Sequence, residues 1–269
     1  ASSGLTLRSL SEIVNGFSPI PMLYIVLSLA VIRLIRWVWS CVYKSRSTES
    51  KREVKRFAIN AFHFFATILA FFYLLWGFNY YRPSMSDALK LSDIKPDSTI
   101  IFDEFVKITK IVQKERLSFS KDSMLNLIID PLSLENQIRN LENKLLPTLN
   151  IPTPGRIRVR VLKPKGALLI FSTAGIYIPF AMEGHIDAGL HPIVWPFTLA
   201  HEMAHGYGIT DEGECNFIAM LACIQTTDPL LRYSAILEYW RYLYRRVESC
   251  DAQITFDIKE QLDCRVITD

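Results

Sequence analysis

Residues 196–216 read PFTLAHEMAHGYGITDEGECN and contain the pattern HExxH. On an α-helix, side chains at positions i and i+4 project from one face, so His201 and His205 can both direct a ring nitrogen at one metal ion. Glu202 then lies beside the position of a metal-activated water, where it can act as the general base of hydrolysis. The apolar residues before the motif are compatible with a helix, and the glycines after it are typical of a helix end. The segment therefore predicts a Zn²⁺ site with two histidine ligands.

Zinc needs a third protein ligand, and the acids that closely follow His205 are Asp211, Glu212 and Glu214. The spacing HExxHxxGxxD, a metzincin-like arrangement, would select Asp211. However, Asp211 is also a good helix N-cap, with Glu214 at the reciprocal position of a capping box. Glu212 stands one helical turn before Asn216, whose amide could orient a ligand. We therefore expect Glu212 as the third ligand, with Asp211 and Glu214 as alternatives and Asn216 in support.

Two segments near the N-terminus have the length and composition of membrane-spanning helices. Residues 21–41 carry charges only at Arg33 and Arg36, which can reach the interface, and residues 57–80 carry no formal charge. Between them, residues 44–56 (KSRSTESKREVKR) are strongly basic. By the positive-inside rule we expect this loop in the cytoplasm and the rest of the chain on the outer face, with lipid as a partner.

Charge is unevenly distributed along the 269 residues, half of which are hydrophobic. Residues 1–82 carry ten Lys and Arg against three acids, whereas residues 83–269 carry twenty against twenty-four. The basic excess thus belongs to the membrane part, which argues against a nucleic-acid partner. We predict a membrane anchor over residues 1–82 and one extracytoplasmic domain over residues 83–269.

The second part has the pattern of an α+β domain that is mainly helical. Apolar residues recur at helical spacing over 99–115, 133–145 and the segments that begin at 196, 216 and 229. Three shorter stretches are predicted as strands of a small sheet. They are RIRVRVL (156–162, half-exposed by its alternation), ALLIFS (167–172) and GIYIPF (175–180).

Five blocks of the sequence carry a family resemblance. HExxH followed by a helix with E-x-E-x-N-x-F-x-A resembles the gluzincin-type peptidases, in which the first Glu of that helix is the third zinc ligand. More closely, the chain resembles an uncharacterised bacterial family of membrane-anchored, zincin-like proteins with a domain of unknown function. The blocks are WGFNYYRP (76–83), GIYIPF (175–180), HEMAHGYGI (201–209), EGECNFIAMLAC (212–223) and LRYSAIL (231–237). The chain departs from that pattern at residues 179–184, where PFAMEG replaces PFTGEA, and at Gly206, where the family has Gln.

The resemblance implies a membrane-anchored, zinc-dependent metallopeptidase in a bacterial inner membrane, with its zincin-like catalytic domain in the periplasm. In zincins the strand before the active-site helix pairs with extended substrate, which implies that Gly175, Ile176, Tyr177 and Ile178 bind a peptide or protein substrate. The alternative interpretation is a non-catalytic, zincin-fold subunit or scaffold of a larger membrane complex.

Four further polar side chains are candidates for contacting substrate or stabilising an oxyanion. His185 and His191 precede the HExxH segment, and the favoured interpretation of each is a solvated loop histidine. Tyr207 and Tyr233 are weaker candidates for the electrophilic role.

The five cysteines leave two interpretations open. Cys215 and Cys223 are separated by about 12 Å of helical rise and cannot pair with each other. Cys250 and Cys264 could form a disulfide in an oxidising compartment. Otherwise all the cysteines are expected to be small, buried, apolar residues.

Overall fold

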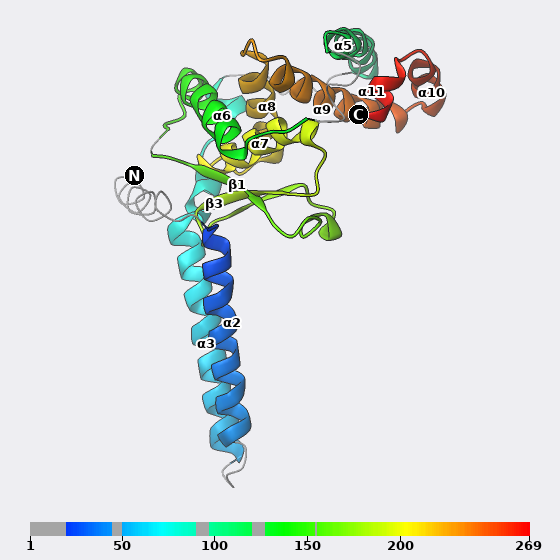
Figure 1. The fold of residues 1–269 in the computed structure, drawn as a ribbon. Helices are drawn as coiled ribbons and strands as arrows, with labels where there is room; N and C mark the ends of the chain where they lie inside the picture. Colours follow the sequence, from blue (N-terminus) through cyan, green and yellow to red (C-terminus); the bar gives the residue numbers. More distant parts are fainter. Residues whose placement is uncertain (1–19, 45–49, 90–96, 120–126, 154) are drawn as a thin grey trace. The chain divides into compact units, whose positions relative to one another are not determined.

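The computed structural model describes residues 20–44, 50–89, 97–119, 127–153 and 155–269. Most of these residues are helical, and three strands form one small sheet, as the sequence predicted (Figure 1). The α-helices are α2 (Met22–Lys44), α3 (Ser50–Leu75), α4 (Met85–Ala88), α5 (Ser98–Leu117), α6 (Pro131–Leu145), α7 (Trp195–Gly206), α8 (Glu212–Ile224), α9 (Pro229–Glu248), α10 (Ala252–Glu260) and α11 (Cys264–Thr268). The 3₁₀-helices are η1 (Gly77–Tyr81), η2 (Leu146–Leu149), η3 (Leu169–Phe171) and η4 (Pro192–Val194), and the strands are β1 (Arg158–Leu162), β2 (Gly175–Ile178) and β3 (Glu183–Asp187).

The chain forms two compact units. One comprises residues 1–82 together with 154–158 and 177–183, and the other comprises residues 83–153, 159–176 and 184–269.

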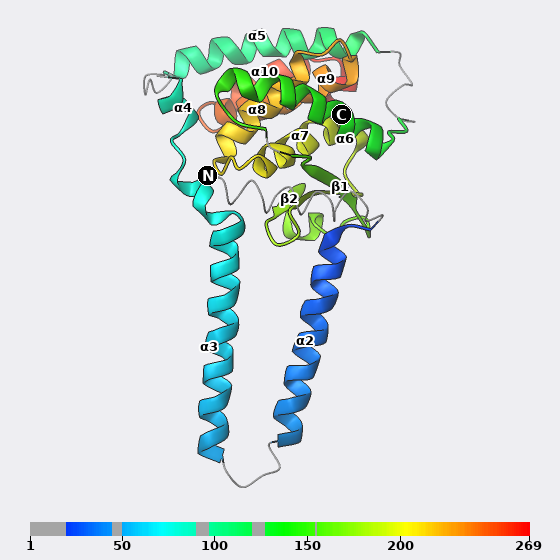
Figure 2. The same ribbon diagram turned by 90° about the vertical axis from the view of Figure 1, so that its left-hand side faces the viewer.

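The first unit contains two helices that are long and apolar enough to cross a membrane. Met22–Ser40 of α2 and Lys55–Leu75 of α3 each have a mean hydropathy of 1.8, and only 6% and 0% of these segments are buried. Neither is therefore a core helix of the described fold. The ring centroids of Trp37 and Phe57 lie 4.8 Å apart, so the end of α2 contacts the start of α3. Both helices are long and nearly straight (Figure 2). Part of the predicted basic loop, residues 45–49, lies outside the described residues.

The end of β2 and the start of β3 belong to the same unit, where they contact the start of α2 and the residue that follows α3. Glu183 is fully buried, and its Oε2 accepts a hydrogen bond of 2.9 Å from the backbone amide of Met22. This carboxylate binds an amide that the start of α2 cannot satisfy internally, and its charge complements the helix dipole. The ring of Tyr177 lies 6.2 Å from the ring of Trp76, directly after α3.

Helix starts in the second unit are set by short polar side chains. An aspartate precedes six of the described helices and accepts a hydrogen bond from a first-turn amide in each. These residues are Asp97, Asp130, Asp211, Asp228, Asp251 and Asp263. Helix α7 differs, because it continues from η4 with no side-chain cap and has Pro196 in its first turn.

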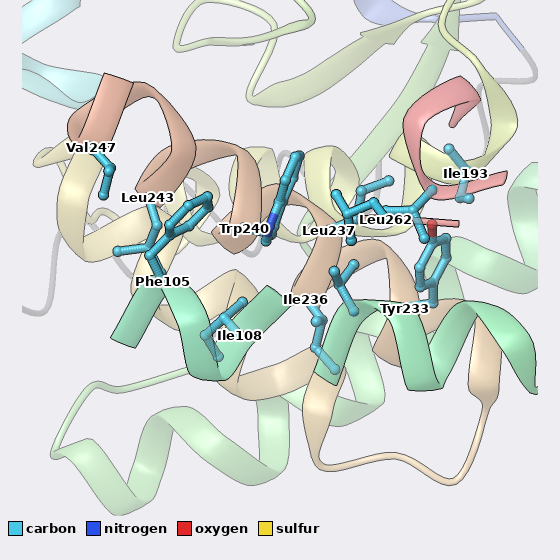
Figure 3. Close-up of a cluster of buried hydrophobic side chains, with 12 residues drawn as sticks. Phe105, Ile108, Ile193, Tyr233, Ile236, Leu237, Trp240, Leu243, Val247 and Leu262 are labelled. Carbon is cyan, nitrogen blue, oxygen red and sulfur yellow. The ribbon is translucent and has the colours of Figure 1, made fainter. Parts of the chain in front are cut away.

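A buried apolar cluster of the second unit lies mainly between α5 and α9 (Figure 3). Phe105 of α5 is fully buried, and its ring centroid lies 6.0 Å from that of Trp240 on α9. The indole nitrogen of Trp240 donates to the hydroxyl oxygen of Thr109 at 2.9 Å, so the ring is oriented as well as buried. The apolar face of α9 that carries Tyr233, Leu237 and Trp240 therefore packs in this core.

The sheet has the strand order β1-β3-β2. Two predictions about it were wrong, namely that residues 167–172 form a strand and that the first strand is half-exposed. Residues 167–172 do not form a strand but a turn that contains η3. The central strand is instead β3, EGHID, which is buried at every position. Arg158 of β1 is buried, so the arginine face of this strand is less exposed than the alternation suggested. The backbone amide of Val159 in the same strand donates to Glu135 of α6 at 3.3 Å.

The cysteines match neither interpretation completely. Cys215 and Cys223 are buried, as expected, whereas Cys250 and Cys264 are exposed free thiols. The disulfide between the last two is therefore not formed.

Candidate metal centre

Helix α7 carries His201, Glu202 and His205 and packs against α6, α8 and α9. Its length is limited by Gly208, whose φ of +88° lies in the left-handed region that favours glycine. The chain turns back there and enters α8. The last carbonyl of this turn, on Ile209, lies 2.8 Å from Nδ1 of His205.

The three acids considered as third ligands have different environments at the start of α8. Asp211 is the N-cap, and its Oδ1 accepts from the amide of Glu214 at 2.9 Å. The carboxylate of Glu214 accepts a hydrogen bond from the backbone amide of Met85. Glu212 alone of the three lies against the histidines, with Oε2 3.0 Å from Nε2 of His201 and Oε1 3.5 Å from Nε2 of His205.

His201, His205 and Glu212 form a cluster with the donors of a metal site. Their ligand atoms all lie within 4.8 Å of one another, and this is the one such group among the described residues. The two Nε2 atoms are 3.2 Å apart. The histidine side chains are 14% and 10% exposed and that of Glu212 is 75% exposed, so the cluster is open to solvent on the side of the acid.

The other ring nitrogen of each histidine is bound to an oxygen. Nδ1 of His201 lies 2.9 Å from Oδ1 of Asn216, and Nδ1 of His205 lies 2.8 Å from the carbonyl of Ile209. These acceptors favour a hydrogen on each Nδ1, which leaves the lone pair of each Nε2 directed into the cluster. Burial, followed by the neighbouring His205, lowers the pKa of His201, which also favours the neutral, ligating form.

Glu202 lies on the strand side of α7 and is 4% exposed. A Cβ built on Gly175 of β2 would lie 2.6 Å from its Oε1, so the absence of a side chain at position 175 makes room for the carboxyl group. The other oxygen, Oε2, is buried without a hydrogen-bond partner in the described structure. Burial, and secondly Glu212, raise the pKa of Glu202 to about 8. A carboxyl group with a raised pKa beside a cluster of ligands is typical of functional sites.

Comparison with known protein families assigns this chain to one of them. A model described as "Protein of unknown function (DUF3810)" matches residues 5–269. The chain belongs to the DUF3810 family. No curated protein and no solved structure matched it. The family description names no activity, so the function of this DUF3810 chain must be argued from its residues.

The remaining candidates of the DUF3810 chain lie elsewhere. His185 is not a solvated loop residue, because it lies in β3 and is fully buried, and neither ring nitrogen has a hydrogen-bond partner among the described residues. His191 is exposed and caps η4. The hydroxyl of Tyr207 donates to Asn143 at 2.7 Å and that of Tyr233 donates to Asp269 at 3.0 Å, so both are engaged away from the cluster.

The predicted substrate strand is β2, which is an edge strand of the sheet. Gly175 borders Glu202, and Ile176 is 40% exposed. Tyr177 and Ile178 belong to the first unit, where Tyr177 contacts Trp76.

One residue near the histidines escaped the sequence reasoning. Cys215, interpreted only as a small apolar residue, is buried with Sγ 3.3 Å from Nδ1 of His205. Burial, and secondly Glu212, raise the pKa of its thiol, so it stays protonated. The sequence spacing could have placed Cys215 on the same helix face as Glu212. The residues on that face are Glu212, Cys215, Asn216 and Ala219, which have the spacing 0, 3, 4, 7.

Proposed function

We propose that this chain is a membrane-anchored, zinc-dependent metallopeptidase with a zincin-like, gluzincin-type domain over residues 83–269. The observation that carries the proposal is the convergence of Nε2 of His201, Nε2 of His205 and the carboxylate of Glu212, with Glu202 beside them. Two imidazoles and one carboxylate are the ligand set of the thermolysin class of catalytic zinc sites.

The distances support zinc as the ion. Two ligands at about 2.0–2.1 Å from a tetrahedral zinc ion lie about 3.3 Å apart. The two Nε2 atoms are 3.2 Å apart, and Oε2 of Glu212 is 3.0 Å from the nearer one. If the tautomers are those favoured by Asn216 and Ile209, two lone pairs face each other at this distance, which is unfavourable without a cation between them.

Glu202 would be the general base of such a site when the metal is bound, because a cation close to its carboxyl group would lower the raised pKa. Zinc bound there would lower the pKa of a water toward about 7. Glu202 would receive the proton of that water through its unpartnered Oε2 and pass it to the leaving amine. Its side chain is buried and restricted by Gly175, which favours one position of the carboxyl group.

The edge strand β2 supports a peptide as substrate. An extended peptide can add to the edge strand of a sheet by main-chain hydrogen bonds, which give affinity, while side-chain pockets give specificity. Gly175 borders Glu202, so a peptide paired with β2 near this residue would have its backbone close to the general base. We therefore propose Gly175, Ile176, Tyr177 and Ile178 as the segment that binds substrate.

We also propose that residues 1–82 anchor the protein in a bacterial inner membrane, with the loop 44–56 cytoplasmic and the domain over residues 83–269 periplasmic. The two apolar helices and the basic residues between them support this topology. The exposed thiols of Cys250 and Cys264 are natural reporters. In intact cells an impermeant maleimide should label them, and labelling only after cell lysis would contradict the orientation.

Glu202→Gln is the variant that tests catalysis most directly. It should retain stoichiometric zinc, because the ligands are intact, and lose about 10²- to 10⁴-fold in hydrolysis of a broad peptide library. His201→Ala should lose both zinc and activity. Glu260→Gln, which removes an exposed acid on α10, controls for the loss of a negative charge.

Two results would refute the peptidase proposal. If wild type and Glu202→Gln are equally inactive, yet both hold zinc and complement a deletion strain equally, the site is structural. The chain would then be a non-catalytic subunit or scaffold of a membrane complex. If purified wild type holds no zinc and gains none on dialysis against it, the metal assignment itself fails.

A further inference from the structure

The segment between β1 and β2 presents an apolar tip made of Leu169, Ile170 and Phe171. These three consecutive side chains are 40%, 77% and 75% exposed. Single exposed apolar residues are common on soluble proteins. Three adjacent large ones on one turn indicate a surface that binds a partner. The tip belongs to neither the metal cluster nor the core between α5 and α9.

Every backbone amide of residues 166–173 donates a hydrogen bond within the protein. The carboxylate of Asp187 accepts from the amides of Gly166 at 2.7 Å, Leu168 at 2.6 Å and Leu169 at 3.3 Å. The amides of the other residues in 166–173 donate to backbone carbonyls between Pro164 and Leu169. These donors are Ala167, Ile170, Phe171, Ser172 and Thr173. The tip can therefore leave water without exposing an unsatisfied amide hydrogen, which lowers the cost of entering the interfacial region of a membrane.

The same contacts hold the tip in one conformation. Asp187 is fully buried in β3, and it also accepts from the amide of Gly189 at 2.6 Å. One carboxylate thus binds four amides and fixes the turn to the central strand of the sheet. A tip ordered in advance loses little conformational entropy when it binds.

Charge beside the tip indicates which surface it meets. Lys163 and Lys165 are exposed at the start of the same segment. Apolar side chains next to lysines are the pattern of protein segments that lie in the headgroup region of anionic membranes.

We propose that Leu169, Ile170 and Phe171 insert into the interfacial region of an anionic lipid bilayer. A protein partner fits less well, because a stable interface needs about 800 Å² on each side, and three side chains on a narrow turn offer far less. The two candidate membrane helices keep the segment tethered to a bilayer, so a weak contact suffices. This proposal does not depend on peptidase activity.

A fluorescent probe on the full-length chain tests the proposal. Ile170→Cys is labelled with NBD after Cys41, Cys250 and Cys264 are changed to Ser, and the protein is reconstituted in nanodiscs with anionic phosphatidylglycerol. The same probe at Ile128→Cys is the control, because Ile128 is apolar and 95% exposed in the same unit. The probe at position 170 should emit at shorter wavelength, be quenched by brominated lipid and show an iodide quenching constant at least about fivefold lower than the control.

Each other result has a definite meaning. Equal iodide quenching at positions 170 and 128 would show that the tip stays in water and would overturn the proposal. Shielding from iodide without quenching by brominated lipid would overturn it in favour of a second copy or another protein. In the double variant Lys163→Gln and Lys165→Gln, iodide quenching of the probe at position 170 in anionic discs should rise to the level that this probe shows in neutral discs. No increase would refute the role of the lysines. Near-UV circular dichroism of each variant checks that the fold is intact.

Discussion

One methyl group at position 175 should displace the carboxyl group of Glu202. A Cβ at this position would lie 2.6 Å from Oε1, 2.7 Å from Cγ and 2.9 Å from Cδ of Glu202. Non-bonded carbon atoms prefer separations of about 3.5–4.0 Å, so the side chain must move by about 1 Å. Glu202 is 4% exposed and cannot simply turn into solvent. We therefore expect Gly175→Ala to act on the general base.

The size of the effect follows from packing and from geometry. Forcing a methyl group into a packed interior costs about 1–3 kcal/mol of folding free energy. A catalytic group misplaced by about 1 Å loses on the order of 10²-fold in rate. The three atoms nearest to the added Cβ all belong to Glu202, so zinc content should not change. Thermal unfolding, kcat/KM on a peptide library and metal analysis measure the three quantities.

Gly184→Ala is the matched control for this prediction. Its Cβ would lie 3.0 Å from Cβ of Glu202 and 3.0 Å from Cγ2 of Val159, so it presses on the stem of the side chain rather than on the carboxyl group. We expect a similar loss of stability with a smaller loss of rate. If Gly175→Ala unfolds at the wild-type temperature and hydrolyses peptides at the wild-type rate, the placement of Glu202 against β2 is wrong.

Two further predictions concern metal affinity and stability against pH. Asn216→Ala should weaken zinc binding about 10- to 100-fold in competition with a chelator, because Nδ1 of His201 loses its oxygen partner, while Asn216→Asp should retain most of the affinity. Burial, and secondly Arg160, lower the pKa of His185 from 6.5 to about 4. The unfolded chain therefore binds this proton first, and stability that is complete above pH 6.5 should fall by about 3 kcal/mol as the pH drops to 4. Denaturant unfolding in detergent measures that slope, and a slope that persists unchanged in His185→Phe would refute its assignment to this residue.

The elements that depend on local sequence could be predicted. The HExxH helix follows from the spacing of its side chains, and Asp211 and Asp228 mark helix starts by binding amides within their own first turn. The long apolar helices follow from composition alone. In each case the interactions that decide the structure join residues within about four positions of one another.

The sheet depended on distant contacts and could not be predicted in the same way. ALLIFS has the composition of a strand, but its amides bind Asp187, about twenty residues later, and the segment turns instead. EGHID has no apolar alternation, yet it becomes the central strand, where Glu183 meets the start of α2. Contacts with distant parts of the chain decide that these polar residues are buried. No periodic pattern of apolar residues in the local sequence predicts it.

The candidate site depends on two separate parts of the second unit, which bears on how its function can be dissected. Helix α8 supplies Glu212 and Asn216 and so sets the positions of the histidines. The glycines of β2 and β3 instead approach Glu202, and Gly175 and Gly184 are the positions where a Cβ would meet it. Substitutions on α8 should therefore alter metal affinity first, and substitutions on the strands should alter proton transfer first. A scaffold with a structural zinc ion would need only the first group of contacts, so the close packing of the strands on Glu202 is the feature that favours an enzyme.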